Sequence, residues 1–171
     1  IPTRNRLTLL KTCIDGLLRQ TDYDAFDIRI VDNGSDDAET LRYLDQLIKR
    51  SNISVLRDGG TFNFSRLCNL GARDASGDYL CFLNNDVEPA NPDWLAELVA
   101  EAARPEVGLA GAKLLYPDRT VQHAGIALSG AHVARHTNLG IQAHDGAGAV
   151  RRDRCLHGHA AENFRDDRRF R

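Results

Sequence analysis

The sequence contains no methionine, few aromatic residues and no long apolar run. Its longest apolar stretches are a few residues, far short of the roughly 20 that a membrane-spanning helix needs. The cysteines form no C-x-x-C pair, and three of the four lie inside apolar stretches, which indicates reduced core thiols in a reducing compartment. With 42% hydrophobic and 27% charged residues among 171, the composition excludes wholesale disorder, collagen-like repeats and coiled coils. It predicts one globular domain.

Two phosphate-binding fingerprints are also missing, G-x-G-x-x-G and G-x-x-x-x-G-K-[ST]. Any bound pyrophosphate must then be held chiefly by a metal ion and by backbone amides. The chain opens on Ile1-Pro2, which has the character of the end of a strand, so we expect it to be an excised piece of a longer protein.

The charge is distributed unevenly. Residues 1–150 carry a net charge of −5, whereas residues 151–171 carry 7 arginines, 4 acids and a net charge of +3. A basic tail can bind nucleic acid or anionic lipid, but acids interleaved with the arginines favour a solvated segment. We therefore predict a domain over residues 1–145 and an Arg-rich, poorly ordered tail over residues 146–171.

Short apolar runs alternate with helical periodicity, a pattern typical of βα units and a parallel sheet. Strands are predicted after an initial one ending at Ile1, at residues 26–31, 53–56, 79–83, 107–115 and 121–128, and helices around residues 7–17, 41–48, 65–75 and 94–102. The run at residues 79–83 is the densest and predicts a central strand buried on both faces. Predicted helix caps are Asn5, Ser35 or Asp36, and Asn63. No element is predicted beyond Gly130.

Three polar clusters follow predicted strands, at residues 2–5, 32–35 and 84–86. Each alone can be a set of strand ends and helix caps, but ligands of open α/β sheets bind beyond the carboxyl ends of the strands. Asp86, a carboxylate flanked by amides, suits a divalent cation that takes its other ligands from water and phosphate. Asp32 is placed to accept hydrogen bonds from a ribose or a base N–H.

Seven motifs then follow one another in order. They are I-P-T-R-N at 1–5, V-D-N-G-S at 31–35, F-N-F-S-R-L-C-N-L-G-A at 62–72, G-D-Y-L-C-F-L-N-N-D at 77–86, N-P-D-W-L at 91–95, V-G-L-A-G-A-K-L-L-Y-P-D at 107–118 and Q-H-A-G at 122–125. Over roughly residues 1–145 the chain resembles family 2 glycosyltransferases, especially the rhamnosyltransferase-like enzymes of bacterial surface polysaccharide synthesis. The resemblance implies a Rossmann-like GT-A fold, truncated here at both ends, and inversion at the anomeric carbon.

The resemblance also implies roles for individual residues. Asn84-Asn85-Asp86 matches the D-x-D position, so Asp86 would hold Mn²⁺ or Mg²⁺ on the nucleotide diphosphate, although the first acid of the motif is Asn84 here. Asp32 would contact the base or ribose. The full set of residues implied to contact the nucleotide is Pro2, Thr3, Arg4, Asp32, Asn69, Arg73, Asn84 and Asn85. Gly71 would allow close packing of its helix, and His123 would line the donor-sugar or acceptor side.

The implied partners are a nucleotide-diphosphate sugar of the UDP or dTDP type and a glycan or glycolipid acceptor. No nucleic-acid partner is expected, and the parent protein is expected in the cytoplasm or peripherally at the inner face of the membrane. The family's general base, a carboxylate in a later E-D or D-D motif, has no counterpart in its expected context. Asp166-Asp167 lies in the Arg-rich tail, and we do not assign it this role.

Other functions remain open at this stage. A non-catalytic nucleotide-sugar-binding module is the main alternative, because no base is assigned. A nucleotidyltransferase would need glycines in the loop after the first strand, and a haloacid-dehalogenase-type phosphatase would need an aspartate where Pro2 and Thr3 stand. His132 and His136, four residues apart, would suit zinc only on a helix, and the glycine and alanine around them favour a loop.

Overall fold

The computed structural model describes residues 1–73, 75–128, 134–136 and 149–152. The helices are α1 (Leu7–Gln20), α2 (Ala38–Leu47), α3 (Phe64–Ala72) and α4 (Trp94–Ala102). The strands are β1 (Pro2–Thr3), β2 (Ile28–Asp32), β3 (Ile53–Arg57), β4 (Val87–Pro89), β5 (Lys113–Leu115), β6 (Val121–His123), β7 (Ile126–Leu128), β8 (Ala134–His136) and β9 (Ala149–Arg152). The predicted α/β class with a parallel sheet flanked by helices is confirmed.

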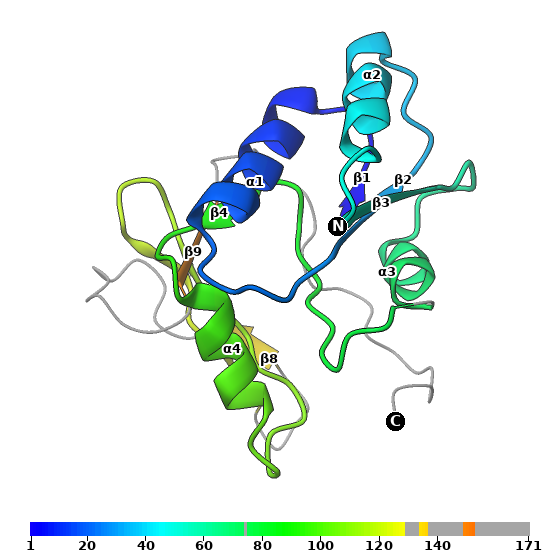
Figure 1. Ribbon diagram of the computed structural model, residues 1–171. Coiled ribbons are helices and arrows are strands. Elements are labelled where there is room, and N and C mark those ends of the chain that lie inside the picture. Colours follow the sequence, from blue (N-terminus) through cyan, green and yellow to red (C-terminus); the bar gives the residue numbers. More distant parts are fainter. Residues whose placement is uncertain (74, 129–133, 137–148, 153–171) are drawn as a thin grey trace.

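Strands β1, β2 and β3 form a parallel sheet in that order. Helices α1 and α2 lie on one side of this sheet and α3 lies on the other (Figure 1). The alternation along β2 explains this arrangement, because Ile28 and Ile30 pack in the core with α1 and α2 while Val31 faces α3. The register sets Thr3 beside Asp32 and Asp32 beside Arg57, so the three strands end together.

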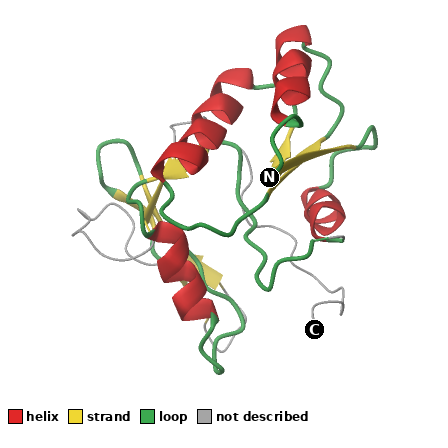
Figure 2. Cartoon of the chain, in the orientation of Figure 1, coloured by secondary structure: helices red, strands yellow, loops and turns green. Residues whose placement is uncertain are grey.

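A second sheet has the order β4-β9-β5-β6, in which β9 runs antiparallel to β4 and parallel to β5. Helix α1 packs on β4 and so joins the two sheets, which lie in different parts of the cartoon (Figure 2). Trp94 fixes α4 to the end of α1, since its Nε1 donates to Thr21 Oγ1 at 2.9 Å. Strands β7 and β8 form a separate antiparallel pair.

The predicted central strand at residues 79–83 is wrong. The structure gives these residues no strand, and Tyr79, Leu80 and Phe82 are 49%, 45% and 42% exposed. A dense apolar run becomes a buried strand only when a neighbour supplies backbone partners. Strand β1 has just two residues, and Pro2 has no N–H to donate.

Two other predicted strands are longer than the strands in the structure. Of residues 107–115 only Lys113–Leu115 is a strand, and residues 121–128 divide into β6 and β7 at Gly125, whose φ is 112°. Positive φ favours glycine and interrupts the strand there. The strands β8 and β9 lie where no element was predicted. Of the two histidines weighed for zinc, His136 lies at the end of β8 and His132 lies outside the described residues. The rest of the predicted tail lies outside the described residues.

Gly71 confirms the close packing predicted for its helix. A Cβ at this position would lie 3.1 Å from Val31 Cγ2, and Val31 is 1% exposed, so α3 approaches β2 as closely as glycine allows. We expect Gly71→Val to lower the free energy of unfolding by about 1–3 kcal/mol through overpacking. Urea denaturation measures the change. Gly59→Val is the control because a Cβ there meets nothing within 4 Å, and an equal loss in both variants would contradict the packing argument.

Candidate functional site

All three polar clusters meet at the carboxyl edge of the parallel sheet, where Thr3 of the first cluster contacts the other two. The Thr3 carbonyl accepts a hydrogen bond from the Asn33 amide at 2.8 Å. The Thr3 hydroxyl oxygen accepts another from Asn85 Nδ2 at 2.9 Å. The structure therefore brings Thr3, Asp32, Asn33 and the turn at Asn84–Asp86 into one connected group.

The Asp32 carboxylate is 1% exposed and is held on both oxygens. Its Oδ1 accepts hydrogen bonds from the Ser35 amide at 3.1 Å and from the Ser35 hydroxyl at 2.5 Å. Its Oδ2 lies 3.6 Å from Arg57 Nη1, and the same guanidinium reaches the exposed Asp45 at 3.4 Å. Asp32 thus shapes the turn after β2 at the edge of the sheet.

Asn5 joins the loop after β1 to the loop after β2, a function that differs from the predicted cap of α1. Its Oδ1 accepts hydrogen bonds from the amides of Asp36 and Asp37, each at 3.1 Å, and its own amide donates to Ser35 Oγ at 2.7 Å. Asn5 and Arg6 both have left-handed φ values, 52° and 57°. Asparagine tolerates this conformation better than most residues, which suits it to a tight linking loop.

Asn33 joins the loop after β2 to the loop after β3. Its Nδ2 donates to the Asp58 carbonyl at 3.2 Å, to Asp58 Oδ2 at 3.0 Å and to the Gly60 carbonyl at 2.8 Å. The residue is 3% exposed, and within the described residues its Oδ1 is buried without a hydrogen-bond partner. A buried acceptor is costly unless something satisfies it, so Asn33 Oδ1 is a candidate ligand contact. Within the cluster at residues 32–35 the sequence pattern indicates Asp32 as the ligand residue and does not distinguish Asn33.

Asp58 and Arg66 close the loop between β3 and α3. The Arg66 guanidinium contacts both Asp58 oxygens, at 2.5 and 2.7 Å, and also donates to the Thr61 carbonyl at 2.8 Å. These hydrogen bonds from Arg66 lower the pKa of the Asp58 carboxyl below its usual range. Asn63 caps α3 as predicted, since its Oδ1 accepts from the Arg66 amide at 2.9 Å.

The Asp58–Arg66 pair predicts a pH dependence of stability. Because the pKa of Asp58 is lower in the folded chain, the pair stabilises the fold above the unfolded pKa of about 3.9. This contribution is lost as the pH falls through the lower folded value. We expect the melting temperature of the wild type to fall more between pH 7 and pH 3 than that of Asp58→Asn. Asp24→Asn, at an exposed aspartate, should follow the wild type, and parallel curves for all three would contradict the prediction.

Asp86 offers one half-buried carboxylate in the turn after residue 84. Throughout the described residues no group of three His, Cys, Asp or Glu side chains converges on a point that could hold a metal ion. This donor set does not fit a complete protein cage. It fits a divalent cation that takes one carboxylate from the protein and its remaining ligands from water and phosphate oxygens. The amide oxygens of Asn84 and Asn85 are hard donors of the same kind.

The other predicted site residues lie around this group or away from it. Pro2 is half-buried in β1, whereas Arg4 is exposed in the following loop. Asn69 and Arg73 are exposed near the end of α3, and the Arg73 amide bonds the Asn69 carbonyl at 3.1 Å. His123 lies in β6 of the second sheet, so it is not part of the Thr3 group.

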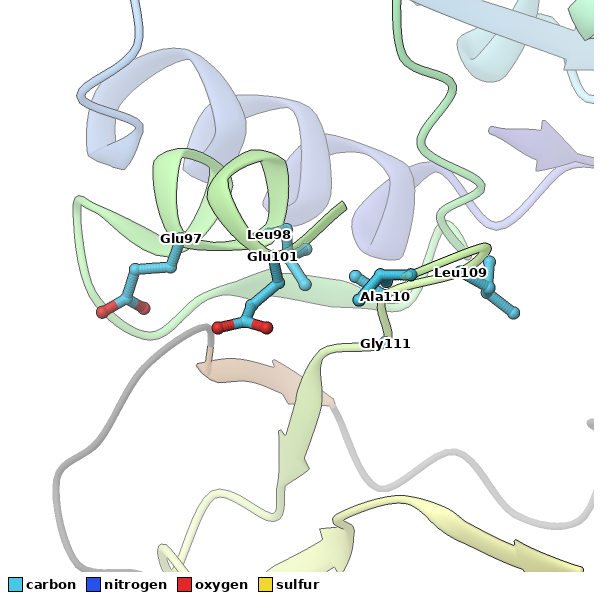
Figure 3. Close-up of a pocket in the computed structure, with 7 residues that line it drawn as sticks. Glu97, Leu98, Glu101, Leu109, Ala110 and Gly111 are labelled. Atoms are coloured by element: carbon cyan, nitrogen blue, oxygen red, sulfur yellow. The ribbon is translucent and has the colours of Figure 1, made fainter. Parts of the chain in front are cut away.

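A pocket of about 320 Å³ lies elsewhere, between α4 and the segment that follows it. It is lined by Glu97, Leu98, Glu101, Val107, Leu109, Ala110 and Gly111. Figure 3 shows the carboxylates of Glu97 and Glu101 extending from α4 in one direction. None of the predicted site residues lines this pocket.

No helix in the described part of the chain is both long and apolar enough to cross a membrane.

Residues 1–148 match the family described as Glycosyl transferase family 2. The chain is 43% identical over 140 residues to the uncharacterized protein y4gI of Sinorhizobium fredii, covering 81% of this chain and 15% of that protein. It is also 43% identical over 136 residues to the O-antigen biosynthesis protein RfbC of Myxococcus xanthus, covering 80% of this chain and 11% of that protein. The chain thus spans a small part of both relatives.

Two solved structures share the fold. A mannosyltransferase of Pyrobaculum calidifontis, in complex with GDP-Man and Mn²⁺, has a TM-score of 0.55 at 20% identity, covering 67% of this chain and 33% of that chain. TarS of S. aureus has a TM-score of 0.52 at 20% identity with the same coverages. At this level of identity the likeness concerns the fold alone.

Proposed function

Since the chain belongs to glycosyltransferase family 2, we propose that it forms the donor-binding domain of an enzyme that transfers a sugar from a nucleotide-diphosphate sugar to a glycan or glycolipid acceptor. The observation that carries this proposal is the connected group of Thr3, Asp32, Asn33 and Asn84–Asp86 at the carboxyl edge of a parallel sheet. Ligands of open α/β sheets bind at this edge. RfbC, named for O-antigen biosynthesis, supports a reaction in surface polysaccharide synthesis.

Different residues of the site are proposed to contact different parts of the nucleotide-sugar donor. Asp32 and Asn33 form the loop at the ribose and base, and Asn33 Oδ1, buried without a hydrogen-bond partner among the described residues, is the acceptor proposed for an N–H group. Pro2, Thr3 and Arg4 form the loop along the nucleotide. Asp86, with the amides before it, would hold a divalent cation, Mn²⁺ or Mg²⁺, beside the diphosphate. That cation, when bound, neutralises the charge of the leaving diphosphate.

The transfer itself is a displacement with inversion. An acceptor hydroxyl oxygen forms the new bond to the anomeric carbon while the bond from that carbon to the diphosphate oxygen breaks. The hydroxyl proton passes to a general base, which typically contributes about 10²–10⁴-fold to the rate.

We propose a location in the cytoplasm or at the inner face of the membrane, in keeping with the buried free thiols of Cys13 and Cys68.

Donor binding is tested by calorimetric titration of the full chain with UDP, dTDP and GDP, each with and without Mn²⁺. We expect Mn²⁺-dependent binding of a uridine or thymidine diphosphate. GDP tests the alternative indicated by the mannosyltransferase, whose structure contains GDP-Man. Absence of Mn²⁺-dependent binding of all three would overturn the proposal.

We expect this chain to bind the nucleotide-sugar donor but to transfer the sugar only slowly. Because the sequence offers no general base in its expected context, sugar transfer should be slower than in the parent protein by about the 10²–10⁴-fold that a base supplies. Transfer assayed with a panel of nucleotide sugars, for this chain and for the parent protein, measures the difference. Equal rates would show that the 171 residues contain the base. Binding without transfer in either protein would favour the non-catalytic binding module.

A further inference from the structure

The turn that carries Asp86 is attached to the rest of the fold by two contacts just before that residue. Asn85 Nδ2 donates to Thr3 Oγ1 at 2.9 Å, and the Cys13 thiol donates to the Asn84 carbonyl at 3.6 Å. Thr3 is 5% exposed and Cys13 is fully buried, so both anchors belong to the rigid interior. The position of the Asp86 carboxylate therefore depends on contacts made by its neighbours in the chain.

Thr3 makes two hydrogen bonds at this edge of the sheet, one through its side-chain hydroxyl and one through its backbone carbonyl. Its hydroxyl holds the turn at Asn85, while its carbonyl holds the Asn33 amide in the loop after β2. A single residue thus links the loop proposed to face the base with the turn proposed to hold the cation. A buried hydroxyl already engaged by an amide is suited to fixing a neighbour, whereas contact with a ligand would require it to be reachable.

We propose that Thr3 and Asn85 are a positioning pair, whose hydrogen bond fixes the Asp86 turn relative to the nucleotide loop and so couples cation binding to nucleotide binding. The inference rests on the proposed function. A cation held by one protein carboxylate completes its shell with phosphate oxygens, so its affinity depends on where that carboxylate stands relative to the diphosphate. By linkage, the factor by which the cation tightens nucleotide binding equals the factor by which the nucleotide tightens cation binding.

The test compares two substitutions at Thr3. Thr3→Val removes the hydroxyl and keeps the shape, whereas Thr3→Ser keeps the hydroxyl. Titration of the full chain with UDP and with dTDP, with and without Mn²⁺, gives the coupling factor, and electron paramagnetic resonance gives the affinity for Mn²⁺ alone and with nucleotide. We expect Thr3→Val to reduce the coupling by about 10–100-fold, the usual effect of losing a contact that orients a metal ligand. Nucleotide affinity should fall more in the presence of Mn²⁺ than in its absence, and Thr3→Ser should retain the coupling.

Thr40→Val provides a matched control. Thr40 is fully buried and its hydroxyl also makes a side-chain hydrogen bond, to Asp37 Oδ2 at 2.6 Å, at the start of α2. This variant should lose stability but keep the coupling factor. Asn85→Ala should reproduce the Thr3→Val effect, and the double variant should add nothing, because both substitutions break one hydrogen bond.

The outcomes separate this inference from the proposed function. If the wild type binds UDP or dTDP with Mn²⁺ and Thr3→Val keeps its full coupling factor, the positioning pair is refuted and the proposed function stands. Equal losses with and without Mn²⁺ in Thr3→Val would also refute it, because they would show that Thr3 contacts the nucleotide directly. No Mn²⁺-dependent binding by the wild type would overturn both proposals.

Discussion

Asp86→Asn is expected to remove the Mn²⁺ dependence of nucleotide binding. The substitution leaves the turn with three consecutive amides and no carboxylate, since Asn84 and Asn85 precede it. Loss of a contact that merely orients a metal ligand costs about 10–100-fold in metal affinity, and loss of the ligand itself should cost at least as much. Affinity for the nucleoside diphosphate in the presence of Mn²⁺ should fall to the metal-free value.

Calorimetric titration with UDP and dTDP measures this loss, and Asp78→Asn is the matched control. Asp78 is an exposed aspartate in the same segment, so its substitution makes the same change of charge outside the turn. It should bind as the wild type does. Binding that depends on Mn²⁺ in Asp86→Asn as strongly as in the wild type would remove Asp86 from the cation site.

Asp32→Ala is expected to have the second-largest effect, on stability and on binding together. The substitution removes the acceptor for the amide and the hydroxyl of Ser35, and hydrogen bonds to a charged group contribute about 1.5–3 kcal/mol each. Because a solvated serine can recover part of this, we expect the free energy of unfolding to fall by about 2–4 kcal/mol. The loop after β2 should lose its shape, and nucleotide affinity should fall with it.

Asp45→Ala separates the buried contacts from the ion pair. Asp45 contacts the same Arg57 guanidinium, but its side chain is 66% exposed. Exposed pairs contribute roughly 0–1 kcal/mol, so this variant should unfold nearly as the wild type does in a urea titration. Equal destabilisation in the two variants would show that Arg57, and not the buried turn at Ser35, carries the effect of Asp32.

The helices and the parallel sheet could be predicted because their signal is local. Leu10, Ile14 and Leu17 form one face of α1 by spacing alone, and all three are buried. The cap of α2 could not be chosen in this way. Three adjacent polar residues can cap a helix in that loop, and tertiary contacts decide among them. Ser35 is held by Asp32 and Asp36 by Asn5, so the Asp37 side chain bonds the Thr40 amide.

The wrong prediction of a strand at residues 79–83 arises because strand pairing is not a local property. An apolar run predicts burial, but pairing depends on what the neighbouring strand offers, and no local pattern contains that information. The site shows the same division. Strand ends identified Asp32 and the cluster at residues 84–86 as candidates, whereas the contacts of Thr3 with Asn33 and Asn85 join residues far apart in the sequence. Only the folded chain shows which polar groups are already engaged.

The three hydrogen bonds that Asn33 Nδ2 donates have a consequence for the chemical ageing of the protein. Asn33 is followed by Gly34, and hydrolysis of its side-chain amide would replace the nitrogen by oxygen. That oxygen would face the Gly60 carbonyl at 2.8 Å and Asp58 Oδ2 at 3.0 Å, an arrangement of acceptors without a donor. Like charges so close oppose ionisation, so the pKa of Asp58 would rise and its pair with Arg66 would weaken. Deamidation at one position would thus open the loops at the sheet edge, and a stored sample would lose its site before it lost its fold.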